Sequence, residues 1–190
     1  MNILLHICCA PCAIHPVEEL KRQKHAVAGY FYNPNIHPCA EYVKRRDEVK
    51  RYAKDTPLTV VYADYDIENY FQRIVYNEAP KDRCPVCWWT RIEAAAKFAK
   101  ENGFDAFTTT LLGSPYQDHG VIRKLGEDVA SSAEITFHYE DYRAGFRAAH
   151  ERAKAQGLYC QNYCGCIFSE RERVEKKDKS HKVTRVGVRY

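Results

Sequence analysis

Apolar residues along the chain fall into short β-branched and aromatic runs that alternate with amphipathic stretches of helical spacing. Strands are expected at residues 2–7, 26–32, 58–62, 104–111 and 135–138, and helices at about 13–24, 39–54, 67–77, 85–102, 117–130 and 144–155. Strands separated by helices of this length favour a mostly parallel, five-stranded sheet with helices on both faces. The pattern predicts a three-layer, Rossmann-like α/β sandwich, with one domain over residues 1–170 and a basic tail over residues 171–190.

Two loops of unusual composition follow strands of this expected sheet. The cysteine-rich segment of residues 8–12 follows the first strand, and the threonine-rich segment of residues 108–115 ends the fourth. Ligands of open parallel sheets bind beyond the carboxyl ends of the strands. We therefore expect both loops to lie at one edge of the sheet and to form a binding site there.

Composition excludes several classes of protein. The 190 residues are 45% hydrophobic and 28% charged, with a net charge of +4, which is typical of a globular protein in water. No apolar run approaches the roughly 18–20 residues that span a bilayer, and the N-terminus lacks the features of a signal peptide. We expect a cytoplasmic protein without a membrane partner. The basic tail is compatible with nucleic-acid contact, and so is the patch at residues 44–46, although a solvated helix face explains either.

Nine cysteines are too many for a cytosolic chain without a reason, and an odd number cannot pair completely. Burial as small hydrophobic residues suits Cys39 and Cys160. It does not suit the remaining cysteines, which occur as CC-x-x-C, C-x-x-C and C-x-C.

The strongest chemical signal is Cys84-Pro-Val-Cys87 combined with Cys8-Cys9-Ala-Pro-Cys12. Thiolates at this spacing bind one metal centre from a single turn. Cys84 and Cys87 are expected to straddle a helix start, whose free amides stabilise thiolates. We predict ligation by Cys8, Cys9, Cys84 and Cys87, with Cys12 as the rival for one of these places.

The kind of metal stays open on spacing alone, because two C-x-x-C pairs suit structural zinc as well as an iron–sulfur cluster. A thioredoxin-like pair at Cys84 and Cys87 is a weaker option, since it needs no second cysteine loop.

The third cysteine group is Cys164-Gly165-Cys166. A disulfide across C-x-C closes a small, strained ring, which favours a redox-active pair or ligands of a second metal ion over a structural bridge. Two incidental cysteines are the remaining explanation. Acid–base candidates near expected loop ends are Asp64 and Asp118, although capping or surface roles are commoner for any single such residue.

Five segments of the chain form a distinctive combination: LLHICCAPC at residues 4–12, FYNPNIHP at 31–38, RCPVCW at 83–88, ENGFDAFTTTLLGSP at 101–115 and QNYCGCIFSE at 161–170. Together they resemble one family, the epoxyqueuosine reductases known as QueH. The resemblance implies the α/β fold of HUP and PP-loop tRNA-modifying enzymes. It also implies reduction of epoxyqueuosine to queuosine at the wobble position of tRNA, with an electron donor as a further partner.

The cofactor and its ligands follow from the same resemblance. A [4Fe-4S] cluster would be held by Cys8, Cys9, Cys84 and Cys87, and a second, mononuclear iron is an option. The C-x-C motif of the family falls on Cys164 and Cys166.

Three other functions compete with this interpretation. A zinc-stabilised tRNA-binding module would lack redox activity. A cluster-dependent tRNA thiolase needs an ATP-binding PP-loop after the first strand, where this chain has CCAPC instead. A thiol–disulfide oxidoreductase would work without metal.

Overall fold

The computed structural model describes residues 1–185, and the side chains of residues 1–178. In chain order the elements are β1 (Asn2–His6), α1 (Ala10–Arg22), β2 (Ala26–Phe31), α2 (Cys39–Asp55), β3 (Val60–Tyr62), α3 (Ile67–Ile74), α4 (Pro80–Glu101), β4 (Ala106–Thr109), α5 (His119–Ala133), β5 (Thr136–Phe137), α6 (Phe146–Ala155) and α7 (Ile167–Arg185). Short 3₁₀ helices lie at Thr110–Gly113 and Tyr142–Gly145. No helix of the described chain is long and apolar enough to cross a bilayer.

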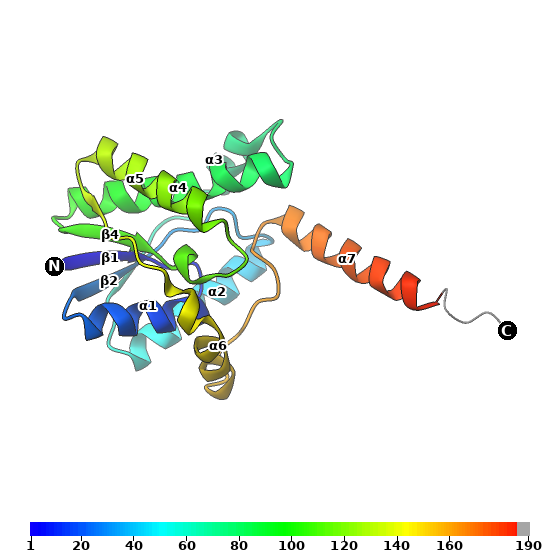
Figure 1. Cartoon of the computed structure of the whole chain (residues 1–190), viewed down its shortest axis with the longest axis horizontal. Coiled ribbons are helices and arrows are strands. Elements are labelled where there is room, and N and C mark those ends of the chain that lie inside the picture. The colour runs from blue at the N-terminus through cyan, green and yellow to red at the C-terminus, as the bar shows by residue number, and fades with distance from the viewer. Residues whose placement is uncertain (186–190) are drawn as a thin grey trace.

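The strands form one sheet in the order β3-β2-β1-β4-β5, and every neighbouring pair is parallel. Helices cover both faces, with α4 and α5 on one side and α1 and α6 on the other (Figure 1). The predicted three-layer, Rossmann-like α/β fold is therefore confirmed.

Strand β1 is the centre of the sheet and of the core. Leu5 joins an apolar cluster built with α1, α2 and α6, whereas Leu4 joins a cluster built with α4 and α5. Both side chains are fully buried. A strand that is covered on both faces is apolar at successive positions, which explains the continuous apolar run at the N-terminus.

The register places the ends of β1 and β4 side by side, with His6 opposite Thr109. The loops that follow these strands consequently meet, and the amide of Cys8 donates a hydrogen bond to Oγ1 of Thr110 at 3.0 Å. The predicted convergence of the two loops at the carboxyl edge is confirmed.

Several helix ends agree with the sequence, but two starts do not. Asp66 caps α3 by accepting from the amide of Asn69, and Gly103 follows α4 with φ of +72°. However, α1 begins at Ala10 and α4 at Pro80. Backbone N–H groups at the first helical position have no acceptor within the helix, so a proline there loses no hydrogen bond. Pro80 therefore starts α4.

The early start of α4 changes the setting of its cysteines. Cys84 and Cys87 lie beyond the first turn, where the backbone amides are already used within the helix. The expectation that these two thiols face the free amides of a helix start is wrong.

Helix α7 was not anticipated. It crosses the expected domain boundary between residues 170 and 171 and leaves the α/β body as a projecting arm (Figure 1). Residues 186–190 of the expected basic tail lie outside the described residues.

Gly126 allows close contact between α5 and the edge of the sheet. A Cβ atom at this position would lie 2.3 Å from a ring carbon of Phe137. We expect Gly126→Val to lower the free energy of unfolding by about 1–3 kcal/mol more than Ser131→Val. Both variants place a β-branched residue in a helix, but only Gly126→Val also forces a side chain into the Phe137 ring. Ser131 is an exposed position on the same helix. Equal thermal midpoints for the two variants would contradict this packing.

Candidate functional site

Three thiols converge where β1 ends and α1 begins. Cys8, Cys9 and Cys12 place their sulfur atoms within 4.8 Å of one another. Cys9 is the N-cap residue of α1, and Cys12 lies in its first turn. The free amides of a helix start therefore lie beside this group, rather than beside Cys84 and Cys87.

Hydrogen bonds favour a single thiolate in this group, on Cys8. Side-chain hydrogen bonds with Cys12 and Cys9, and with the Thr110 hydroxyl 3.2 Å from its Sγ, hold the Cys8 pKa well below its usual range despite burial. Burial raises the pKa of Cys9, and the hydrogen bond to Cys8 raises that of Cys12. The side-chain amide of Gln161 adds a donor 2.8 Å from the Cys9 sulfur.

A second group of thiols lies between α4 and the start of α7. Cys87 and Cys166 are buried in one small cluster with Tyr70 and Ile74. The Cys166 sulfur accepts from the amide of Ser169 at 3.4 Å, so it caps α7. Burial raises the pKa of Cys87 to about 12 and also raises that of Cys84.

Arg91 links the two groups. Its side chain is 2% exposed, and its guanidinium donates to the Cys87 sulfur at 3.3 Å and to the Cys87 carbonyl at 3.0 Å. Burial lowers its pKa, but attraction to the anionic forms of Cys87, Cys164, Cys8 and Tyr70 outweighs burial and raises it. Among the side chains of residues 1–178 no carboxylate forms an ion pair with it. The site therefore holds a buried cation whose facing groups are sulfur atoms.

A second buried arginine holds the C-x-C loop. Arg45 donates to the carbonyls of Cys164 and Tyr163 at 2.9 and 3.2 Å, and it pairs with Glu41 at 2.7 Å. It is 2% exposed, so the expected basic surface patch at residues 44–46 loses its central member to the interior. Gly165 adopts φ of +144° within this loop, a backbone region that favours glycine.

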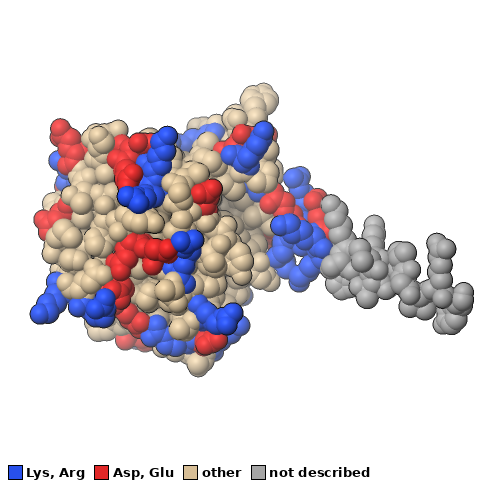
Figure 2. Space-filling view, viewed as in Figure 1, with Lys and Arg blue, Asp and Glu red and all other residues tan. Residues whose placement is uncertain are grey.

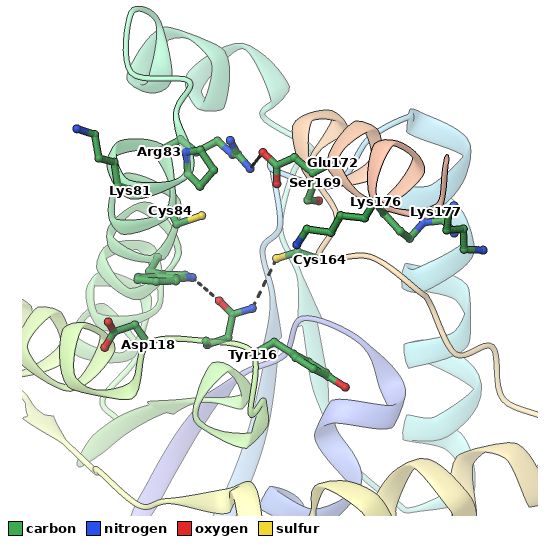
Figure 3. Close-up of a pocket in the computed structure, with 14 residues that line it drawn as sticks. Lys81, Arg83, Cys84, Tyr116, Asp118, Cys164, Ser169, Glu172, Lys176 and Lys177 are labelled. Atoms are coloured by element: carbon green, nitrogen blue, oxygen red, sulfur yellow. Dashed lines mark hydrogen bonds and ion pairs between the residues drawn. The ribbon is translucent and has the colours of Figure 1, made fainter. Parts of the chain in front are cut away.

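The thiols open into two cavities that meet. A thiol cavity of about 730 Å³ is lined by Cys8, Cys12, Arg91, Thr110 and Cys164, among others. An outer groove of about 760 Å³ lies between α4 and α7 and has Cys84 and Cys164 in its wall (Figure 3). Gln117 lines both, accepting from the Trp88 indole at 2.9 Å and donating toward the Cys164 sulfur at 3.7 Å.

The predicted site residues are thus only partly brought together. Cys8, Cys9 and Cys12 form one group, whereas Cys84, Cys87 and Cys166 lie in the second. Cys164 lines the cavities between them, and no disulfide joins any of the nine cysteines. Cys39 is exposed rather than buried.

The two acidic candidates differ in position. Asp118 lines the outer groove, and its Oδ1 caps α5 by accepting from the Val121 amide at 3.0 Å. Asp64 is exposed and lies in the lining of neither cavity.

Sequence reasoning missed the polar side chains that hold the sulfur atoms: Arg91, Thr110, Gln117 and Gln161. One signal was readable for Arg91, because it stands four residues after Cys87 and so shares a helix face with it. Nothing in the local sequence marks the two glutamines, whose role depends on contacts across the fold.

The donor set fits a soft, thiolate-bound metal centre. Several thiols that gather beside helix amides and a buried guanidinium suit zinc or iron–sulfur centres, whose bound thiolates are anionic. A hard, oxygen-ligated cation such as magnesium does not match these donors.

Comparison with known proteins identifies the family. The family model described as "Epoxyqueuosine reductase QueH" matches residues 3–172. The chain belongs to the QueH family. The match contains all nine cysteines and ends within α7.

Relatives from distant bacteria agree with this assignment. A QueH epoxyqueuosine reductase of Histophilus somni is 37% identical over 90% of this chain and 73% of its own. One from Thermotoga maritima is 34% identical over 92% of this chain and 93% of its own. A crystal structure described as a predicted subunit of tRNA methyltransferase from Methanocaldococcus jannaschii shares the fold alone, with a TM-score of 0.50 at 16% identity over 81% of this chain and 76% of that chain.

The Cys8 thiolate gives a prediction for the metal-free QueH chain. Alkylation of Cys8 by iodoacetamide should reach its midpoint below pH 9.0, the ordinary thiol value. Thr110→Val removes a donor to the thiolate and should move this midpoint to higher pH, whereas Thr59→Val, at an exposed threonine, should not. Peptide mass mapping at each pH measures the rate.

The same shift has a consequence for stability. Because the folded pKa of Cys8 lies below its unfolded value, the thiolate stabilises the fold above the unfolded pKa, and this contribution is lost as pH falls through the folded pKa. A wild-type alkylation midpoint at or above pH 9.0 would contradict the assignment of the thiolate to Cys8.

Proposed function

We propose that this chain reduces epoxyqueuosine in the wobble position of tRNA to queuosine. The epoxide oxygen leaves as water, and the reaction consumes two electrons and two protons from a donor outside the chain. Membership of the QueH family supports the reaction. The observation that carries the redox chemistry is that two groups of cysteines gather at a cavity around buried Arg91, which pairs with no carboxylate among the described side chains.

We further propose that the thiols hold a [4Fe-4S] cluster, which supplies electrons one at a time when bound. Cys8 and Cys9 are proposed as ligands with Cys84 and Cys87. Cys12 competes for one place, and its sulfur within 4.8 Å of the first two supports it. Cys164 and Cys166 would form a redox pair or hold a second iron.

The protein side chains have separate tasks in this proposal. Arg91 offsets the negative charge of the thiolates inside the protein, where an unpaired charge is costly. Thr110 and Gln161 donate to Cys8 and Cys9 and hold their sulfur atoms in place. Asp118 is the better placed of the two acidic candidates to deliver a proton from Oδ2, because it lines the groove that contains Cys84 and Cys164.

The test is direct. Protein purified without oxygen should contain iron and sulfide and show broad visible absorption, and it should convert epoxyqueuosine tRNA with the loss of one oxygen atom by mass spectrometry. Colourless protein with tetrahedral zinc and no turnover would instead support the zinc-stabilised tRNA-binding module, whose ligand type this donor set also fits.

Replacing single cysteines separates ligands from bystanders. We expect Cys84→Ser to abolish both the visible absorption and turnover, because a hard hydroxyl replaces a soft thiolate ligand. Cys39→Ser is the matched control, since Cys39 is exposed at the start of α2, and it should keep both. A fully active, colourless Cys84→Ser protein would refute the cluster assignment. Cys12→Ser in the same assay decides whether Cys12 is a ligand.

Arg91 should set the reduction potential of the centre. Arg91→Met removes the buried positive charge, so the added electron is less stabilised and the potential should fall by roughly 60 mV or more, a tenfold change for a one-electron couple. Arg91→Lys keeps the charge and should shift the potential less. Potentiometric titration followed by electron paramagnetic resonance measures both, and an unchanged potential in Arg91→Met would reduce its role to packing.

A further inference from the structure

The outer groove is walled by two elements that are distant in sequence. The first turns of α4 form one side and α7 forms the other, and the loop at residues 116–118 closes the inner end. Helix α7 projects from the α/β body (Figure 1), and its exposed residues Lys176 and Lys177 line the groove. The groove therefore leads from the protein surface to Cys84 and Cys164.

The groove has a surplus of positive charge. Five cations contribute to its lining, against two acids: Lys81, Arg83, Arg173, Lys176 and Lys177, with Asp118 and Glu172. Both acids are already engaged, because Glu172 pairs with Arg83 at 2.6 Å and Asp118 caps α5. Figure 2 shows Lys and Arg side chains gathered on the described part of α7.

Three of these cations have no acidic partner among the side chains of residues 1–178. Lys81, Arg173 and Lys176 form no ion pair with any carboxylate whose side chain the structure describes. Nε of Arg173 is buried without a hydrogen-bond partner. Lys81 and Lys176 come from opposite walls, and Lys176 reaches toward Cys164 (Figure 3).

An exposed aromatic ring stands where the groove meets the thiol cavity. Tyr116 is 84% exposed and lines both cavities, together with Gln117 and Cys164. Its ring meets that of Phe146 edge-on, with the centroids 5.9 Å apart, which leaves ring surface free for another partner. Free aromatic faces beside cations are typical of surfaces that bind single-stranded RNA, because bases stack on the ring while cations contact phosphates.

We propose that the outer groove is the RNA-binding surface of this protein, in which α7 and the start of α4 contact phosphates of the anticodon loop and Tyr116 stacks on a base beside the reacting nucleoside. The inference rests on the proposed function for the identity of the RNA. An acidic electron-donor protein would also suit positive charge, but it does not explain an exposed aromatic ring at the passage to the thiols.

Two double variants of equal charge test the phosphate contacts. Lys81→Gln with Lys176→Gln removes one cation from each wall of the groove. Lys97→Gln with Lys124→Gln removes two exposed lysines from the far half of α4 and from α5. Dissociation constants for transfer RNA are measured over a range of salt concentrations. The first variant should bind roughly tenfold more weakly near physiological salt, and its log–log salt slope should be smaller by about 1.4–1.8, the value for two lost phosphate contacts.

Stacking is tested at the same time. Tyr116→Ala should weaken binding by roughly tenfold, as loss of a stacked base does, whereas Tyr116→Phe keeps the ring and should bind like the wild type.

In steady-state assays the lysine variant should raise KM for tRNA and keep kcat within about twofold, because the cations bind substrate without entering the chemistry.

The outcomes that would overturn the inference are distinct from failure of the proposed function. Equal weakening by the two lysine double variants would show that only net charge matters. Normal tRNA binding with loss of reduction by a protein donor, but not by a chemical reductant, would assign the groove to the donor instead. Because binding is measured without turnover, a wild-type protein that binds tRNA through the groove yet reduces nothing would refute the reductase proposal alone.

Discussion

The buried charge of Arg91 is the constraint around which the site is organised. A guanidinium with no carboxylate partner among the described side chains is costly inside a protein, so the groups around it must supply negative charge. The Cys8 thiolate supplies such a charge, and the sulfur atoms of Cys87 and Cys164, from two other parts of the chain, face the same guanidinium. Arg91 therefore makes the cysteines an electrostatic unit even though they do not form a single close cluster.

The fold brings this unit together by placing element ends at one edge. Parallel pairing of β1 with β4 sets Cys8 beside Thr110, and α1 begins within the same group of thiols, with Cys9 as its N-cap residue. The start of α7 is capped by Cys166, so a second helix start also lies among the cysteines. Two helix starts therefore lie among the sulfur atoms of the site.

Buried hydrogen bonds give the loops a fixed shape that short-range sequence preferences do not provide. Arg45 reaches from α2 to two carbonyls of the C-x-C loop, and Gln117 connects the Trp88 indole to the Cys164 sulfur. The sulfur of Cys164 is thereby held at the boundary between the thiol cavity and the outer groove. An inner site for electron chemistry and an outer surface for RNA would then share one wall.

The sequence by itself determined the parallel α/β fold, the meeting of the two loops and the family, because these depend on hydrophobic periodicity and on motifs that are local in the chain. It did not determine where α4 begins, since both Pro80 and Pro85 are acceptable near a helix start. Nor did it reveal α7 or the positions of Arg45 and Arg91 in the interior, because the local pattern of an arginine is the same on a solvated helix face. Only the tertiary structure decided which thiols approach one another and which cations face them, since those contacts join residues up to about 150 positions apart, as Gln161 and Cys9 are.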